Sequence, residues 1–156
     1  MRTITLAGVL LVALAFHGAV VSAQAIFVNP GVKLGYTFGD KGGFTVGGEI
    51  SVTTLPVNAS YFLGGLVGLD YCFGAHRTKA HLGLEAGALG VGVDVGPSWV
   101  SQVGKSDMGI TISPFIGLVL YPYYSTTLMF HGDDIHELGL WGKWPIPVVN
   151  NINIFD

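Results

Sequence analysis

Residues 43–54 read GFTVGGEISVTT, and this stretch decides the fold because its apolar and polar residues alternate with a period of two. In an extended strand, alternate side chains point to opposite faces. One face would carry Phe44, Val46, Gly48, Ile50 and Val52, and the other would carry Thr45, Gly47, Glu49, Ser51 and Thr53. The same alternation recurs in later segments, and few other elements remain to cover the apolar faces. A closed barrel in a membrane satisfies this pattern, because lipid covers the outer face and every strand edge is paired.

The N-terminus has the three parts of an export signal. Arg2 gives a positive start, residues 6–16 form an apolar run, and Val21-Ser22-Ala23 is a small-residue ending. This order predicts a signal peptide over residues 1–23, cleaved before Gln24. An uncleaved anchor is the alternative, although the run is short for a helix that spans a bilayer. The expected location is therefore the outer membrane of a Gram-negative bacterium.

Composition also favours a membrane protein. Half of the residues are hydrophobic, 11% are charged, and 24 glycines are dispersed through the apolar segments. After cleavage the chain would have six basic and ten acidic residues, and this net charge of −4 gives no reason to expect nucleic acid as a partner. The only cysteine, Cys72, cannot form an intramolecular disulfide and is expected to be a small interior residue.

The spacing of the alternating segments predicts one all-β domain over residues 24–156, an antiparallel up-and-down transmembrane barrel with eight strands. The strands are expected at residues 27–39, 43–54, 61–73, 78–88, 91–100, 108–120, 124–130 and 136–144. The boundary at Leu89-Gly90 is either a turn or a bulge within one long strand. A short C-terminal tail, residues 145–156, begins at Pro145, and residues 152–155 are a candidate for one further strand.

Charged residues decide which face of each strand points inward. Lys33, Glu49, Asp70, Lys79 and Glu85 all fall on the less apolar face. Turning the strands over would place them in lipid, at about 2–4 kcal/mol for each basic residue near the midplane and less for each acid. The charges are therefore expected in the lumen.

Aromatic residues near the predicted strand ends are expected to form interfacial girdles, because Tyr and Trp prefer the boundary between lipid and water. The set comprises Tyr36, Phe38, Tyr61, Tyr71, Phe73, Tyr121, Tyr123, Tyr124 and Trp144. The alternative is the core of a soluble β-sandwich. A helical membrane protein is disfavoured, because no segment after the signal offers the roughly 20 uncharged residues that a spanning helix needs.

With these features the chain resembles the small bacterial outer-membrane β-barrels of the OmpA/OmpX type. The resemblance is architectural, extends over most of residues 27–144, and matches no specific family. It implies an eight-stranded barrel embedded in outer-membrane lipids. One departure is at the C-terminus: such proteins usually end on an aromatic residue, whereas here Phe155 is followed by Asp156.

Hairpin geometry predicts which inward residues meet. A turn over residues 74–77 would place Asp70 opposite His81, and a turn over residues 40–42 would place Lys33 opposite Glu49. These pairings predict a lumen ion network that consists of Lys33, Glu49, Asp70, Lys79, His81 and Glu85. The sharper alternative is a catalytic dyad of Asp70 and His81 that activates an inward serine, Ser51 or Ser113. No GxSxG motif accompanies these residues, so the ion network is the favoured interpretation.

No other motif points to a cofactor. His131, Asp133, Asp134, His136 and Glu137 form the densest polar cluster, but their spacing is not diagnostic of a metal site, and an exposed loop is the expected structure. The sequence therefore predicts a small barrel with a structural or interaction role, a lumen filled by side chains, and neither metal nor cofactor. The alternatives are an envelope enzyme that modifies lipid or lipopolysaccharide and a narrow passive pore. No protein partner can be named.

Overall fold

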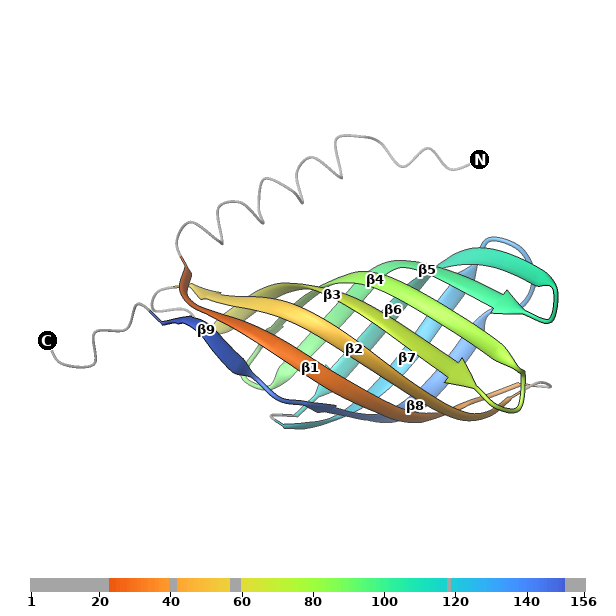
Figure 1. The fold of residues 1–156 in the computed structure, drawn as a ribbon, viewed down its shortest axis with the longest axis horizontal. Helices are drawn as coiled ribbons and strands as arrows, with labels where there is room; N and C mark the ends of the chain where they lie inside the picture. The colour runs from red at the N-terminus through yellow and green to blue at the C-terminus, as the bar shows by residue number, and fades with distance from the viewer. Residues whose placement is uncertain (1–22, 40–41, 57–59, 118, 151–156) are drawn as a thin grey trace, which may run out of the picture.

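In the described part of the chain, nine strands form one antiparallel sheet that closes on itself (Figure 1). The structure is a computed structural model and describes residues 23–39, 42–56, 60–117 and 119–150. The strands are β1 (Ala23–Thr37), β2 (Gly43–Pro56), β3 (Tyr61–Cys72), β4 (Arg77–Ala88), β5 (Val91–Gln102), β6 (Lys105–Ile116), β7 (Leu120–Met129), β8 (Ile135–Lys143) and β9 (Ile146–Asn150). None of the described residues belongs to a helix long and apolar enough to cross a membrane.

The predicted all-β, up-and-down barrel of eight strands is confirmed. Each strand from β1 to β8 pairs with the next, and β8 pairs with β1 to close the barrel. One edge of β1 is shared, because β8 pairs with the segment Gly31–Thr37 and β9 pairs with the segment Ala25–Val28. β9 thus continues the line of β8 within the expected tail. Residues 1–22 of the expected signal peptide and the candidate strand at 152–155 lie outside the described residues.

Two tight turns connect β4 to β5 and β5 to β6. Leu89 and Gly90 have φ values of 51° and 82°, and Val103 and Gly104 have values of 33° and 74°. Two consecutive residues with positive φ are typical of a type I′ hairpin turn, whose twist matches that of the paired strands. Leu89-Gly90 is therefore a turn and not a bulge. The sixth strand ends at Ile116 and the seventh begins at Leu120, and Gly117 between them has a φ of 149°.

The outer face of the barrel is apolar on every strand from β1 to β8, and the charges point inward. The exposed large side chains of β1 to β4 include Val32, Leu34, Tyr36, Phe44, Ile50, Val67, Leu69 and Leu82. Those of β5 to β8 include Val93, Val95, Ile112, Ile116, Leu128, Leu138 and Leu140. The alternation that was read from the sequence therefore predicts both faces correctly.

The aromatic girdle differs from the prediction at two residues. Tyr36, Phe38, Phe44, Tyr71, Phe73, Trp99 and Phe130 are exposed near the end of the barrel that carries the β1–β2, β3–β4, β5–β6 and β7–β8 turns. Tyr123, however, is buried in the lumen, and Tyr121 lines a cavity at the opposite end. Both are odd-numbered residues of β7, on the face that points inward.

Candidate functional site

The lumen is the candidate site, and its first feature is a buried cluster of charges around Asp70. Lys33 Nζ lies 2.9 Å and Lys79 Nζ lies 3.4 Å from Asp70 Oδ2, and Lys79 Nζ lies 3.9 Å from Glu137 Oε2. The Tyr123 hydroxyl donates a hydrogen bond to Glu137 Oε1. We call Lys33, Asp70, Lys79 and Glu137, from β1, β3, β4 and β8, the Asp70 cluster. Because every member is buried, removing one charge would leave its partners uncompensated away from water.

The register of two hairpins differs from the prediction by two residues. Asp70 lies opposite Lys79 and not His81, because the β3–β4 turn occupies residues 73–76 and Arg77 already belongs to β4. Lys33 lies opposite Gly47 and not Glu49, because the β1–β2 connection also includes Phe38 and Gly39. The amide of Phe38 donates to the carbonyl of His136 on β8, whereas the paired residues of β1 and β2 end at Thr37 and Gly43. A slip of two preserves the inward face, so the same residues reach the lumen with different partners.

A second cluster lies toward the end of the barrel where β1 begins. Lys143 Nζ lies 2.6 Å from Glu49 Oε1 and 2.7 Å from Glu85 Oε2. We call these three residues, from β8, β2 and β4, the Lys143 cluster. Five of the six predicted network residues therefore belong to two ion clusters. Lys143 and Glu137 were absent from the predicted network, although the alternation of the last strand marks both as inward residues.

His81, the sixth predicted residue, belongs to a separate hydrogen-bonded chain. Its Nε2 lies 2.9 Å and 3.0 Å from the two carboxylate oxygens of Asp94, and its Nδ1 lies 2.9 Å from Ser98 Oγ. Ser98 Oγ is 2.6 Å from Thr111 Oγ1, which is 2.8 Å from Thr127 Oγ1. Alternation within the predicted strand at residues 91–100 marks Asp94 as an inward residue, and the Leu89-Gly90 turn places it opposite Glu85.

The chain from Asp94 through His81 to Ser98 has the order of a catalytic triad, but its surroundings do not suit catalysis. Ser98 is 0% exposed, so its hydroxyl cannot reach a substrate in this structure. Asp70 and His81, the predicted dyad, have different ionic partners. The other candidate nucleophiles also form structural contacts: Ser51 accepts a hydrogen bond from Asn29, and Ser113 bonds to Ser125. The arrangement can relay a proton along buried hydroxyls, and it orients His81.

Three aromatic rings separate the two ion clusters. Tyr123 stacks on Trp141 with ring centroids 4.6 Å apart, and Phe115 packs edge-on against Trp141 at 5.6 Å. The Trp141 ring contacts both clusters, since Lys33 Nζ and Lys143 Nζ lie 5.0 Å and 4.9 Å from its centroid. Such distances are within the range of cation–π attraction. We call Phe115, Tyr123 and Trp141 the aromatic plug.

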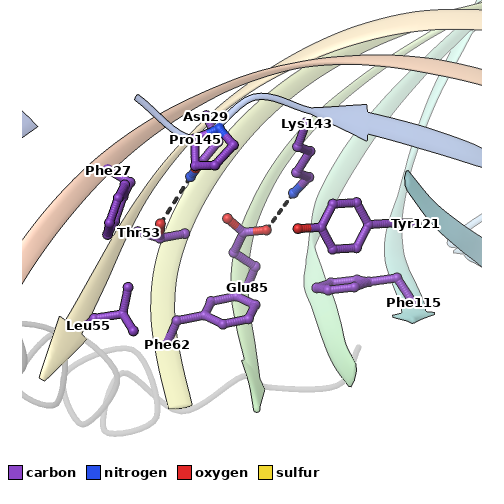
Figure 2. A pocket seen from close by; sticks show the side chains of 10 residues that line it. All are labelled: Phe27, Asn29, Thr53, Leu55, Phe62, Glu85, Phe115, Tyr121, Lys143 and Pro145. Atoms are coloured by element: carbon purple, nitrogen blue, oxygen red, sulfur yellow. Dashed lines mark hydrogen bonds and ion pairs between the residues drawn. The ribbon is translucent and has the colours of Figure 1, made fainter. Parts of the chain in front are cut away.

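A cavity of about 240 Å³ opens at the end of the lumen where β1 begins (Figure 2). Phe27, Leu55, Phe62, Phe115 and Tyr121 contribute most of its walls, and Glu85 and Lys143 contribute its charged floor. We call this cavity the vestibule.

The opposite mouth of the barrel contains the polar segment at residues 131–137. His131 Nδ1 lies 3.2 Å from Asp107, His136 stacks on Tyr124 on the outer face, and Glu137 points into the lumen. The five polar residues of this segment therefore do not converge on one point. Within the described ranges, no group of three His, Cys, Asp or Glu residues could hold a metal ion.

Comparison with known proteins gives one structural similarity. No protein-family model matches the chain, and no curated protein matches it. A solved structure described as "De novo design of transmembrane beta-barrels" is similar, with 12% sequence identity and a TM-score of 0.41. The match covers 78% of this chain and 97% of that chain.

Proposed function

We propose that this protein is an outer-membrane β-barrel of a Gram-negative bacterium, exported by a cleaved signal peptide, with a structural or interaction role and a closed lumen. The observation that carries the proposal is the division of side chains between the two faces. Large apolar residues are exposed on the outer face of every barrel strand, while Lys33, Lys79, Lys143 and their carboxylates are buried inside. A lipid environment stabilises this division, whereas water would face a continuous apolar surface.

Strand length supports the membrane setting. The eight barrel strands have between 9 and 15 residues, and a tilted transmembrane strand needs about 9–11. The exposed aromatic residues near the turns fit one interface of the bilayer, where amphipathic rings are favoured. Outer-membrane lipids are the partners that this surface accepts.

The contents of the lumen support a role other than transport. The interior of an eight-stranded barrel is just wide enough for its own side chains. Here the aromatic plug and the two ion clusters bring charged and aromatic side chains from β1, β2, β3, β4, β6, β7 and β8 into that space. A solute would have to displace paired charges to pass, so a passive pore is disfavoured.

Membrane fractionation tests the proposed setting. The full chain, expressed in a Gram-negative host, should appear in the outer-membrane fraction at the mass expected after cleavage before Gln24. It should also migrate faster on a gel when it is not boiled, because a closed barrel resists detergent unfolding. Recovery in a soluble fraction, or migration independent of heating, would contradict the proposal.

The enzyme alternative has its own test. The Ser98→Ala variant removes the only hydroxyl that bonds to His81 among the described contacts. The proposed role predicts that cells with this variant and cells with the wild-type protein have the same envelope lipids. A lipid species that changes with Ser98→Ala, while the barrel still folds, would favour the enzyme.

A further inference from the structure

The vestibule combines aromatic walls with an ionic floor. Phe62 stacks on Phe115 with centroids 6.4 Å apart, and Tyr121 packs edge-on against Phe115 at 5.6 Å. Figure 2 shows Phe115 and Tyr121 on one side of the cavity, Phe27 and Leu55 on the other, and Glu85 and Phe62 between them. Because the faces of aromatic rings carry partial negative charge, such walls attract a cation as well as hydrocarbon.

The charge of the vestibule floor determines whether a cationic or an anionic ligand is favoured. Two carboxylates, Glu49 and Glu85, share the single ammonium of Lys143, so the Lys143 cluster has a formal net charge of −1. Asp94 lies directly across from Glu85 in the strand register, but its carboxylate bonds to His81 and does not line the vestibule. A ligand carboxylate would be a further anion around Lys143. A ligand ammonium beside Glu85 would instead place a second positive charge next to a carboxylate that Lys143 shares with Glu49.

The size of the cavity limits the ligand. Its volume of about 240 Å³ is below the 300–1,000 Å³ that is usual for sites of drug-sized ligands. A single ring or a short chain with one amine would therefore fill it.

We propose that the vestibule is a binding site for a small hydrophobic amine, whose ammonium pairs with Glu85 and whose hydrocarbon part packs between Phe27, Phe62 and Tyr121. The site goes beyond the structural role proposed above and does not depend on the lipid setting of the barrel. It places a ligand at the mouth of the lumen, on the side where β1 begins, without requiring passage through the aromatic plug.

Three probes of matched size test the sign of the charge. 2-Phenylethylammonium, 2-phenylethanol and phenylacetate are titrated against the folded mature protein in a non-ionic detergent, with binding followed by calorimetry. The ammonium should bind saturably and at least about tenfold more tightly than either analogue, as expected for a hydrogen bond to a charged group. Equal or tighter binding of phenylacetate would overturn the proposal in favour of an anion site. Equal binding of all three would mean nonspecific partitioning and would overturn it as well.

Variants then locate the binding. Glu85→Gln should weaken binding of the ammonium probe at least about tenfold, whereas Asp107→Asn, which removes a carboxylate at the opposite mouth, should leave it unchanged. Leu55→Trp fills the mouth of the vestibule without altering an ion pair and should abolish binding. This second variant keeps the proposal testable if Glu85→Gln does not fold. Unchanged binding by a folded Leu55→Trp protein would overturn the proposal.

Discussion

At the scale of single residues, two glycines make room for the buried charges. A Cβ atom on Gly47 would collide with Asp70 Oδ1 and lie 2.9 Å from the carbonyl oxygen of Leu69. A Cβ atom on Gly83 would collide with Asp94 Oδ1 and lie 2.6 Å from His81 Nε2. Both glycines lie on inward positions directly beside a charged side chain. The ion pairs at these two positions therefore require glycine, because any Cβ atom would occupy the space of a carboxylate.

Gly47→Ala should destabilise the barrel, because the added methyl displaces the Asp70 carboxylate from its lysines. Overpacking of this kind costs about 1–3 kcal/mol. The measurement is the free energy of unfolding from a urea titration in lipid vesicles. Gly48→Ala is the matched control, since its Cβ would lie on the outer face with the nearest atom at 3.7 Å. Equal losses for the two variants would contradict the packing argument.

Asp70 and Lys33 should show energetic coupling. Asp70→Asn leaves Lys33 and Lys79 poorly compensated and should lower the free energy of unfolding by about 3–5 kcal/mol. Adding Lys33→Met should recover part of that loss, with a coupling of about 0.5–3 kcal/mol in a double-mutant cycle. Lys105→Met, at the distant β5–β6 turn, should combine additively with Asp70→Asn. Additive behaviour of Lys33→Met would argue against the observed 2.9 Å contact.

At the scale of strands and turns, the sequence predicts faces better than partners. The period of two is a local property, so the inward position of Lys33, Asp70 and His81 follows from neighbouring residues alone. Partners depend on where each turn begins, and a shift of two residues leaves the pattern of faces unchanged. For this reason the alternation correctly predicts that the network residues point inward, whereas the predicted pairing of Asp70 with His81 is wrong. Asp94 faces inward by the same alternation, but its place opposite Glu85 depends on the Leu89-Gly90 turn.

The β5–β6 turn contains a residue that is poorly suited to its backbone. Val103 has a φ of 33° and is 80% exposed, so its branched side chain is strained there without a packing gain. Val103→Asn should raise the free energy of unfolding by about 1 kcal/mol, because Asn-Gly is the favoured pair in type I′ turns. Val103→Ile retains the β-branch and should give no such gain. A loss of stability on Val103→Asn would mean that the turn has another geometry.

The assignment of the β2 faces can be tested with cysteine labelling. In a background with Cys72→Ser, a label confined to the membrane should react with a cysteine introduced by Ile50→Cys and not with one introduced by Ser51→Cys. The two positions are neighbours in β2, but Ile50 is exposed on the outer face and Ser51 is buried in the lumen. Preferential lipid-phase labelling at position 51 would reverse the assignment.

At the scale of the whole molecule, the strand edges of the barrel are paired and its lumen is filled by side chains. β1 pairs with β2 along its length and divides its other edge between β8 and β9, so no long edge of β1 is left open. Inside, Trp141 contacts lysines of both ion clusters and so connects the two halves of the lumen. The closed edges and the occupied lumen both fit the structural role proposed above. At the end where β1 begins, the lumen opens into the vestibule.

Conductance in planar bilayers tests the filled lumen most directly. The purified mature protein should show no stable, porin-like current steps, because the aromatic plug and the paired charges occupy the lumen. A variant that combines Phe115→Ala with Trp141→Ala removes two rings of the plug and should show more frequent small openings, which confirms that inserted barrels are present in the bilayer. Reproducible large steps from the wild-type protein would contradict both the eight-stranded circumference and the closed lumen.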